Sequence, residues 1–176
     1  MTEVAGDGVI TLRAFRDEDM EPLVRACRDP EVVRWTRVPS PYDESMAREF
    51  RAEMEKRRQD GTVVNSAIAD ASTDDYLGSI DLRIDAPNRR GNIGYLVAPW
   101  ARRRGVAVRA VRLVTAYGFD TLALGRIEIV THVDNPASQG VAERAGFERE
   151  AVLRAYVAER DGGLADGVVF SRVPAG

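Results

Sequence analysis

NIGYLVAPWARRRGVA, residues 92–107, decides the fold because it joins a strand pattern to a helix pattern through an arginine-rich turn. Asn92–Val97 predicts a strand, and beyond the turn an apolar helical face continues at Val106, Ala110, Leu113, Val114 and Tyr117. The N-terminus of such a helix leaves backbone N–H groups unpaired and carries partial positive charge, which favours a phosphate. Gly105 lets the backbone approach an anion, and charged donors that suit phosphate oxygens are added by Arg102, Arg103 and Arg104. The turn therefore predicts a pyrophosphate site.

Two other interpretations of this turn stay open at the level of sequence. The arginines can form a solvated basic turn that caps the helix, or part of a nucleic-acid surface. A nucleic-acid partner is the least favoured, because the formal net charge is −3, the pI is about 5.3 and no aromatic residues are interleaved with the arginines.

The segments around the turn predict an α+β fold with one mixed, mostly antiparallel sheet flanked by helices. Short polar turns separate Val63–Ala69, Leu77–Ile84 and Asn92–Val97, which favours antiparallel neighbours. A strand at Arg126–Val133 follows the helix, and this order predicts a right-handed crossover with one parallel pair.

The two ends of the chain complete the predicted order β-α-α-β-β-β-α-β-α-β-β. On the N-terminal side we expect a strand at Val9–Phe15 and then a helix from Asp17, its cap, to about Asp29. An irregular segment at Glu31–Tyr42 and a second helix at Asp43–Gln59 follow. On the C-terminal side we expect a short helix and two strands, at Pro136–Ala145, Glu150–Ala155 and Val168–Val173.

Length and composition limit the function. The 176 residues predict one domain over positions 1–176, with 44% apolar residues to form a core. No secretory signal and no run of about 20 apolar residues is visible, so we expect no membrane partner and a cytoplasmic location. A single cysteine, Cys27, fits a reducing compartment, and with the single histidine, His132, it excludes an ordinary zinc site of Cys and His ligands.

A second helix start lies at DNPAS, residues 134–138. Asn135 is a good N-cap and Pro136 is favoured at the first helical position, so the pattern is complete as structure alone. Ser138 falls in the first turn, near the positive end of the helix, where its hydroxyl can donate to a developing anion such as a leaving thiolate.

These two stretches, in this order, resemble the GNAT superfamily of acetyl-CoA-dependent N-acetyltransferases. The turn RRRGVA matches the family's [QR]-x-x-G-x-[GA] motif, and IGYLVAPWARRRG, NPASQGVAERAGF, LRAFRDED and DPEVVRWT are similar to its RimJ/RimL-like branch. The resemblance covers about Val9 to Val173.

The resemblance implies a sheet that is splayed between its fourth and fifth strands and binds acetyl-CoA as a cosubstrate, with no metal. The pantetheine would pair with backbone at Leu96 and Val97, and the pyrophosphate would lie on the turn and helix start. The residues implied to bind the cofactor are Leu96, Val97, Arg102, Arg103, Arg104, Gly105, Val106, Ala107, Asn135 and Ser138. The implied reaction is direct attack of a primary amine on the thioester, with Ser138 at the leaving thiolate.

The general base is where the chain departs from the family pattern. Many relatives carry glutamate two residues before the Gly-Tyr of this strand, whereas this chain has Asn92, which takes no proton at neutral pH. Glu128, Asp81, His132 and a water relay are the alternatives, and we predict Glu128 as the catalytic base.

The acceptor amine is less well specified. Trp35 and Tyr42 in the irregular segment, together with Asp81, are the predicted acceptor-binding residues, although each can equally be structural. The acceptor is expected to be a protein N-terminus or a small molecule, and a homodimer is possible for this branch. The alternative function is a non-catalytic acyl-CoA binding module, in which Asn92 reflects lost chemistry.

Overall fold

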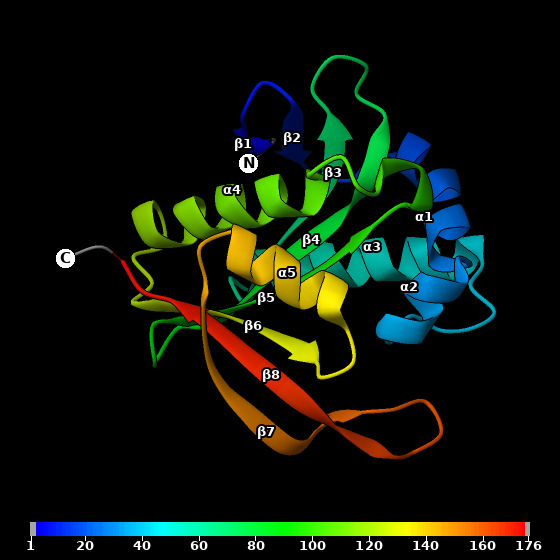
Figure 1. Ribbon diagram of the computed structural model, residues 1–176. Helices are drawn as coiled ribbons and strands as arrows, with labels where there is room; N and C mark the ends of the chain where they lie inside the picture. Colours follow the sequence, from blue (N-terminus) through cyan, green and yellow to red (C-terminus); the bar gives the residue numbers. More distant parts are fainter. Residues whose placement is uncertain (1–2, 175–176) are drawn as a thin grey trace.

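The computed structural model describes residues 3–174, and positions 1–2 and 175–176 of the predicted domain lie outside the described residues. Within these described residues, eight strands form one sheet in the order β1-β2-β3-β4-β5-β6-β8-β7, in which only β5 and β6 pair in parallel (Figure 1). The strands are β1 (Glu3–Gly6), β2 (Ile10–Arg13), β3 (Val63–Asp70), β4 (Tyr76–Asp85), β5 (Arg90–Val97), β6 (Arg126–His132), β7 (Glu148–Ala158) and β8 (Leu164–Arg172). The predicted mixed, mostly antiparallel α+β sheet is confirmed.

Helices cover both faces of the sheet. The helices are α1 (Met20–Cys27), α2 (Pro30–Trp35), α3 (Glu44–Gln59), α4 (Val106–Asp120) and α5 (Pro136–Arg144), with 3-10 turns η1 (Asp17–Asp19) and η2 (Pro99–Ala101). In Figure 1, α4 and α5 lie on the near face, and α3 lies behind the sheet with α1 and α2 beside it. Within residues 3–174 no helix has both the length and the hydropathy needed to cross a membrane.

The parallel pair β5–β6 is splayed. The strands are in register over three positions, Arg90 with Arg126, Gly91 with Ile127 and Asn92 with Glu128. Beyond this point β5 continues to Val97 and β6 continues to His132 without pairing to each other. These are the fourth and fifth strands of the predicted order, so the predicted splay is confirmed.

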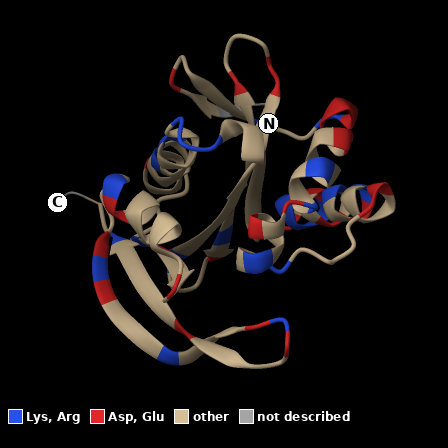
Figure 2. Ribbon diagram, turned by 45° about the vertical axis from the view of Figure 1, so that its right-hand side comes forward, with Lys and Arg blue, Asp and Glu red and all other residues tan. Residues whose placement is uncertain are grey.

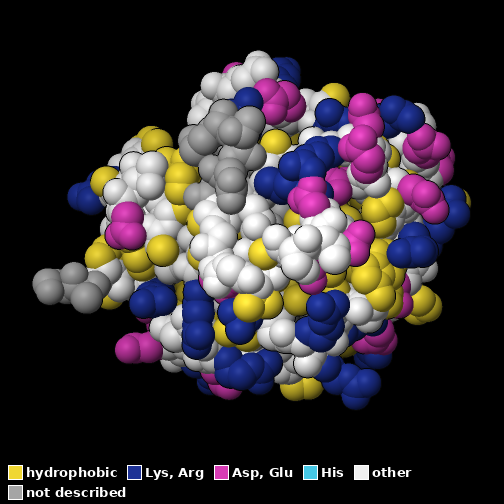
Figure 3. Space-filling view, turned by 90° about the horizontal axis from the view of Figure 1, so that it is seen from above, with side chains coloured by type: hydrophobic (Ala, Val, Ile, Leu, Met, Phe, Trp, Pro, Cys, Tyr) yellow, Lys and Arg dark blue, Asp and Glu magenta, His cyan; other side chains and the backbone are white. Residues whose placement is uncertain are grey.

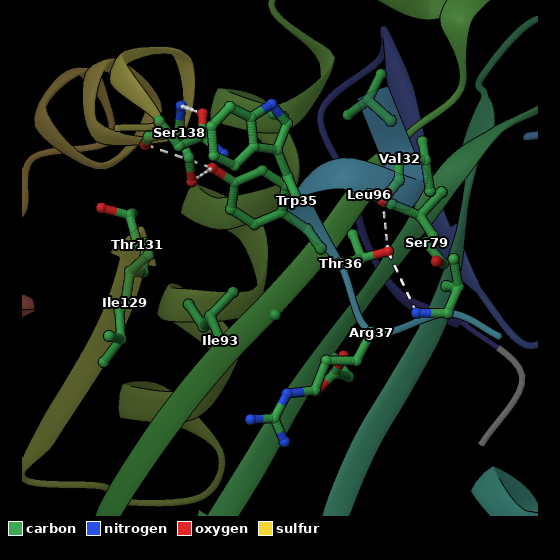
Figure 4. A pocket seen from close by; sticks show the side chains of 18 of the residues that line it. Val32, Trp35, Thr36, Arg37, Ser79, Ile93, Leu96, Ile129, Thr131 and Ser138 are labelled. Atoms are coloured by element: carbon green, nitrogen blue, oxygen red, sulfur yellow. Dashed lines mark hydrogen bonds between the residues drawn. The ribbon is translucent and has the colours of Figure 1, made fainter. Parts of the chain in front are cut away.

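Two glycines explain why the strands meet at one end. A Cβ on Gly91 would lie 2.6 Å from Leu82 Cδ1, and a Cβ on Gly118 of α4 would lie 2.7 Å from Ile127 Cδ1. The missing side chains therefore let α4 pack closely against the paired end of β5 and β6. Beyond the paired end, Ile93 of β5 and Ile129 of β6 line the space between the separating strands (Figure 4).

Several predicted boundaries were wrong, each for a local reason. The segment predicted to be irregular, Glu31–Tyr42, begins with helix α2, because Asp29 accepts hydrogen bonds from Glu31 N and Val32 N and Pro30 occupies the first turn. Arg16, and not Asp17, is the N-cap of the first helical turn, and its backbone N–H donates to Asp19.

The sheet edges also differ from the prediction. The edge strand β1 was not predicted, and the edge strand β7 and its neighbour β8 are longer than the strands predicted at Glu150–Ala155 and Val168–Val173. An edge strand needs apolar side chains on one face at most, so its sequence signal is weak. Much of β7 is solvent-exposed, which agrees with this explanation.

Candidate functional site

A cavity of about 2380 Å³ opens where β5 and β6 separate. It runs from the start of α4, past α5 and the free stretches of both strands, to α2 and the β7–β8 turn. Cavities for a single small ligand occupy roughly 300–1,000 Å³, so this one has room for two molecules at once. Leu96 and Val97 line it and pair only with β4 on their other side, at Ser79 and Gly78.

One end of the cavity is the N-terminus of α4. Gly105 is the N-cap with a φ of 75°, a left-handed conformation that glycine adopts without strain, and nothing lies within 4 Å of an added Cβ. Val106 and Ala107 form the first turn beside the cavity, and this turn carries no acidic residue. The first turn therefore presents its backbone N–H groups and partial positive charge to the cavity.

The three arginines of the turn differ in their surroundings. Arg102 lies 2.5 Å from Asp29 Oδ1, and Arg104 lies 3.5 Å from Asp70 Oδ2 and is not among the residues that line the cavity. In Figure 2 basic and acidic stretches of the ribbon alternate along the chain. Arg103 lines the cavity, and we find no ion pair to it within the described part of the chain. Arg103 is therefore the side chain of this turn best placed to meet an anion.

The ion pairs of these arginines argue against a nucleic-acid-binding surface at this turn. Besides Arg102 and Arg104, Arg109 of α4 is also paired, at 2.7 Å from Asp7 Oδ2. On the face drawn in Figure 3, basic and acidic side chains both occur, and neither sign covers it alone. A polyanion would have to displace these carboxylates.

Further into the cavity, two hydroxyl groups meet. Asn135 caps α5 as predicted, accepting a hydrogen bond from Ser138 N at 3.0 Å. Ser138 Oγ lies 2.8 Å from the hydroxyl of Tyr95 on β5 (Figure 4). Burial raises the pKa of Tyr95, partly opposed by the hydrogen bond to Ser138. The pair is a neutral hydrogen-bond donor at the start of a helix, where an anion is favoured.

Tyr95 and Thr131 are site residues that the sequence analysis missed. Tyr95 belongs to the quoted strand, but nothing in the sequence brings it to a serine 43 positions later. Thr131 of β6 lines the cavity at 3% exposure, and its Oγ1 has no hydrogen-bond partner among the described residues. A buried hydroxyl without a partner is costly, and a ligand that supplies one would remove that cost.

Two carboxylates, Glu128 and Asp81, face the cavity near Asn92. Glu128 is the register partner of Asn92, and Arg126 Nε donates to its Oε1 at 2.7 Å. Asp81 is the register partner of Gly94, and its carboxylate occupies the space that a side chain at Gly94 would need, 3.0 Å from the ideal Cβ.

The environments of these carboxylates differ. Arg126 also forms an ion pair with Glu150, so the positive charge beside Glu128 is shared between two carboxylates. Burial raises the pKa of Asp81, opposed by the charges of Arg83 and Arg57. Arg83 Nε lies 2.9 Å from Asp81 Oδ2, yet that oxygen makes no hydrogen bond within residues 3–174. Asp81 is thus the less satisfied of the two acids.

The far end of the cavity is aromatic. Trp35, the last residue of α2, lies 5.3 Å from the His132 ring between centroids, and both line the cavity. His132 Nδ1 accepts from Asp134 N at 3.0 Å, so its Nε2 carries the proton in the neutral ring and faces Glu159 Oε1 at 3.4 Å. Tyr42 also borders the cavity but is only 4% exposed and belongs to the core.

Comparison with known proteins decides the family. Residues 10–148 match the model of the acetyltransferase (GNAT) domain. The chain belongs to the GNAT acetyltransferase family. It is 31% identical over 163 residues to the uncharacterized N-acetyltransferase p20 of Bacillus licheniformis, covering 92% of this chain and 91% of that protein.

Solved GNAT structures share the fold. RimJ of Mycobacterium smegmatis, in complex with CoA-disulfide, superposes with a TM-score of 0.84 at 20% identity, covering 98% of this chain and 90% of that one. RimL, a ribosomal L7/L12 α-N-protein acetyltransferase in complex with coenzyme A, gives 0.87 at 18% identity and 97% coverage of both chains. The predicted resemblance to the RimJ/RimL-like branch is confirmed for the fold, and the chain is an N-acetyltransferase that uses acetyl-CoA.

Proposed function

We propose that this protein transfers the acetyl group of acetyl-CoA to a primary amine by direct attack while both substrates are bound. The observation that carries the proposal is the splay of β5 from β6 beside the N-terminus of α4. It leaves one strand edge and one helix start facing the same cavity, which suits an extended arm that ends in a pyrophosphate.

The residues present fit this cosubstrate. Backbone groups of Leu96 and Val97 are unpaired toward β6 and would bind the pantetheine amides as an added strand does. The first turn of α4 and Arg103 would hold the phosphates, and the buried Thr131 hydroxyl would gain a partner. Acetyl-CoA supplies an acetyl thioester, whose carbonyl oxygen a backbone N–H near Val97 would polarise.

The amine must lose its proton before it attacks. We propose that Asp81 binds the ammonium form of the acceptor and that Glu128, on the other side of Asn92, receives the proton. The amine nitrogen then forms the new C–N bond with the thioester carbonyl carbon, the C–S bond breaks, and the nitrogen releases its second proton to solvent. Ser138, hydrogen-bonded to Tyr95, donates a proton to the departing sulfur and is reprotonated from solvent through Tyr95.

The proposed acceptors are small primary amines and protein N-termini. RimL is a ribosomal L7/L12 α-N-protein acetyltransferase. AaaT of Escherichia coli, which is 27% identical to this chain over 168 residues, is an L-amino acid N-acetyltransferase. The aromatic end at Trp35 and His132 would receive the rest of the acceptor. A homodimer and a cytoplasmic location stay predictions.

The test is release of free thiol from acetyl-CoA in the presence of polyamines, amino sugars, L-amino acids and N-terminal peptides. We expect acceptor-dependent release with at least one of these classes. Tight CoA binding with no release from any of them would instead support the non-catalytic binding module.

Replacement of Glu128 tests the base. Glu128→Gln keeps the shape but takes no proton, so we expect kcat to fall by about 10²-fold or more and the acidic limb of its pH profile to flatten. Glu150→Gln is the matched control, because it removes the other acid bound to Arg126 at an exposed site. An unchanged kcat and pH profile in Glu128→Gln would remove Glu128 from the mechanism.

A further inference from the structure

The turn between β7 and β8 reaches across to the segment that follows α2. Arg160 in this turn donates from Nε to Val33 O at 2.7 Å, and from one Nη to Thr36 O at 3.0 Å and Val38 O at 2.5 Å. The partners are more than 120 positions apart in sequence. One guanidinium therefore holds three backbone carbonyls of residues 33–38.

The end of α2 explains why a donor from another segment is needed here. The last carbonyls of a helix have no partner within it, and Val33 O belongs to the last turn of α2. Val32 O is already satisfied by Thr36 through its N–H and its hydroxyl, at 3.0 and 2.6 Å. A cation at a helix C-terminus is also favoured by the helix dipole.

The same turn contacts the aromatic end of the cavity a second time. Glu159, next to Arg160, faces His132 Nε2, and His132 lies against Trp35. Residues 159 and 160 therefore hold the two sides of the Trp35–His132 contact, one through the histidine and the other through the backbone around Trp35. Trp35, Thr36, Val38, His132 and Arg160 all line the cavity.

We propose that Arg160 is a positioning residue for the acceptor: by fixing residues 33–38 it sets the position of Trp35, and thereby the affinity for the amine. This rests on the proposed function, because it assigns the Trp35 end to the acceptor. The cofactor end at Gly105 lies beyond the splay and has no contact with Arg160 among the described residues. The effect is therefore confined to one of the two substrates.

Arg160→Met removes the donors and keeps an apolar stem. A hydrogen bond from a charged group has a net value that corresponds to about a tenfold change in binding, so we expect the acceptor KM to rise about tenfold or more. The KM for acetyl-CoA and its Kd should change less than about twofold. Arg160→Lys keeps the charge but cannot reach three carbonyls from one ammonium, so its acceptor KM should lie between those of the wild type and Arg160→Met.

Two controls separate positioning from general destabilisation. Arg154→Met removes an exposed arginine from the same strand β7 and should change neither KM. In a Trp35→Leu background, Arg160→Met should have little further effect on acceptor KM, because the residue through which it acts is gone. A full, additive effect in that background would overturn the proposal, as would an equal rise of both KM values.

A readout without turnover keeps this test apart from the proposed function. In Arg160→Met, backbone amide hydrogen exchange of residues 33–38 should rise, while exchange in α4 and β5 stays as in the wild type. Unchanged exchange at 33–38 would show that Arg160 does not hold the segment, whatever amine the enzyme uses. If exchange rises but the wild type acetylates no amine, the proposed function is wrong, while the conclusion that Arg160 holds residues 33–38 is still supported.

Discussion

Asp81 is a residue at which binding chemistry and stability oppose each other. Its carboxylate is half-buried in the cavity wall opposite Gly94, with Oδ2 inaccessible to solvent, and this burial raises its pKa. A folded-state pKa above the unfolded value means that the native state holds the proton more tightly. The ionised group therefore costs stability at neutral pH, and this cost disappears below the unfolded pKa.

Asp81→Asn should consequently stabilise the protein at pH 7 while it weakens acceptor binding. The gain in Tm should grow as pH rises from about 4, the unfolded pKa of aspartate, through the raised folded pKa, and should be constant above it. Thermal unfolding of both proteins from pH 3.5 to 8 measures this. A Tm gain that is as large at pH 3.5 as at pH 7 would show that ionisation is not its cause.

Ser138 is the second residue with a sharp expectation. Ser138→Ala removes the hydroxyl next to Tyr95 but keeps the backbone N–H that donates to Asn135, so the cap of α5 survives. We expect kcat to fall at least about tenfold, with Tyr95 left as a weaker donor, and Tm to change by less than about 2 °C. Steady-state kinetics with calorimetry checks both, and an unaltered kcat would exclude Ser138 as the proton donor.

At the scale of elements, the start of α4 is the feature on which cofactor binding depends. Gly105→Glu places a negative charge and a side chain in open space at this helix start, and we expect acetyl-CoA affinity to fall by more than about 100-fold. The substitution also strains a left-handed residue by about 1 kcal/mol.

Gly61 supplies the matched control for that strain. It has a φ of +69°, no atom within 4 Å of an added Cβ, and a place in the exposed turn after α3, and it does not line the cavity. Gly61→Glu should lower Tm about as much as Gly105→Glu and leave acetyl-CoA binding intact. Isothermal titration of both variants tests this, and micromolar binding by Gly105→Glu would place the phosphates elsewhere.

At the scale of the whole molecule, acetyl-CoA should stabilise the fold by mass action. At a ligand concentration 100 times Kd the gain is about 2.7 kcal/mol, which raises Tm by roughly 5–10 °C for a chain of this size. Thermal shift against acetyl-CoA concentration measures it. Gly105→Glu should show no shift, and an equal shift in that variant would indicate binding outside the α4 start.

The whole molecule also shows how far sequence reasoning reaches. The helix starts at Gly105 and Asn135 were predictable, because capping and helix-start chemistry depend on neighbouring residues. The splay was reached only through resemblance to a family, since strand patterns do not say where pairing stops. The Tyr95–Ser138 contact and the Arg160 contacts join distant segments, and one sequence carries no signal for such meetings.

The short pairing between β5 and β6 has a mechanical consequence. Five strands lie on one side of it and three on the other, so two parts of the sheet are joined by only three paired positions, with α4 packed on both parts and α5 on the three-strand part. A molecule wedged into the gap and bonded along the edge of β5 would brace one part against the other. The ligand-free enzyme would then be the most flexible state of the catalytic cycle. The gap between β5 and β6 would be most mobile in the state that must bind the next cosubstrate.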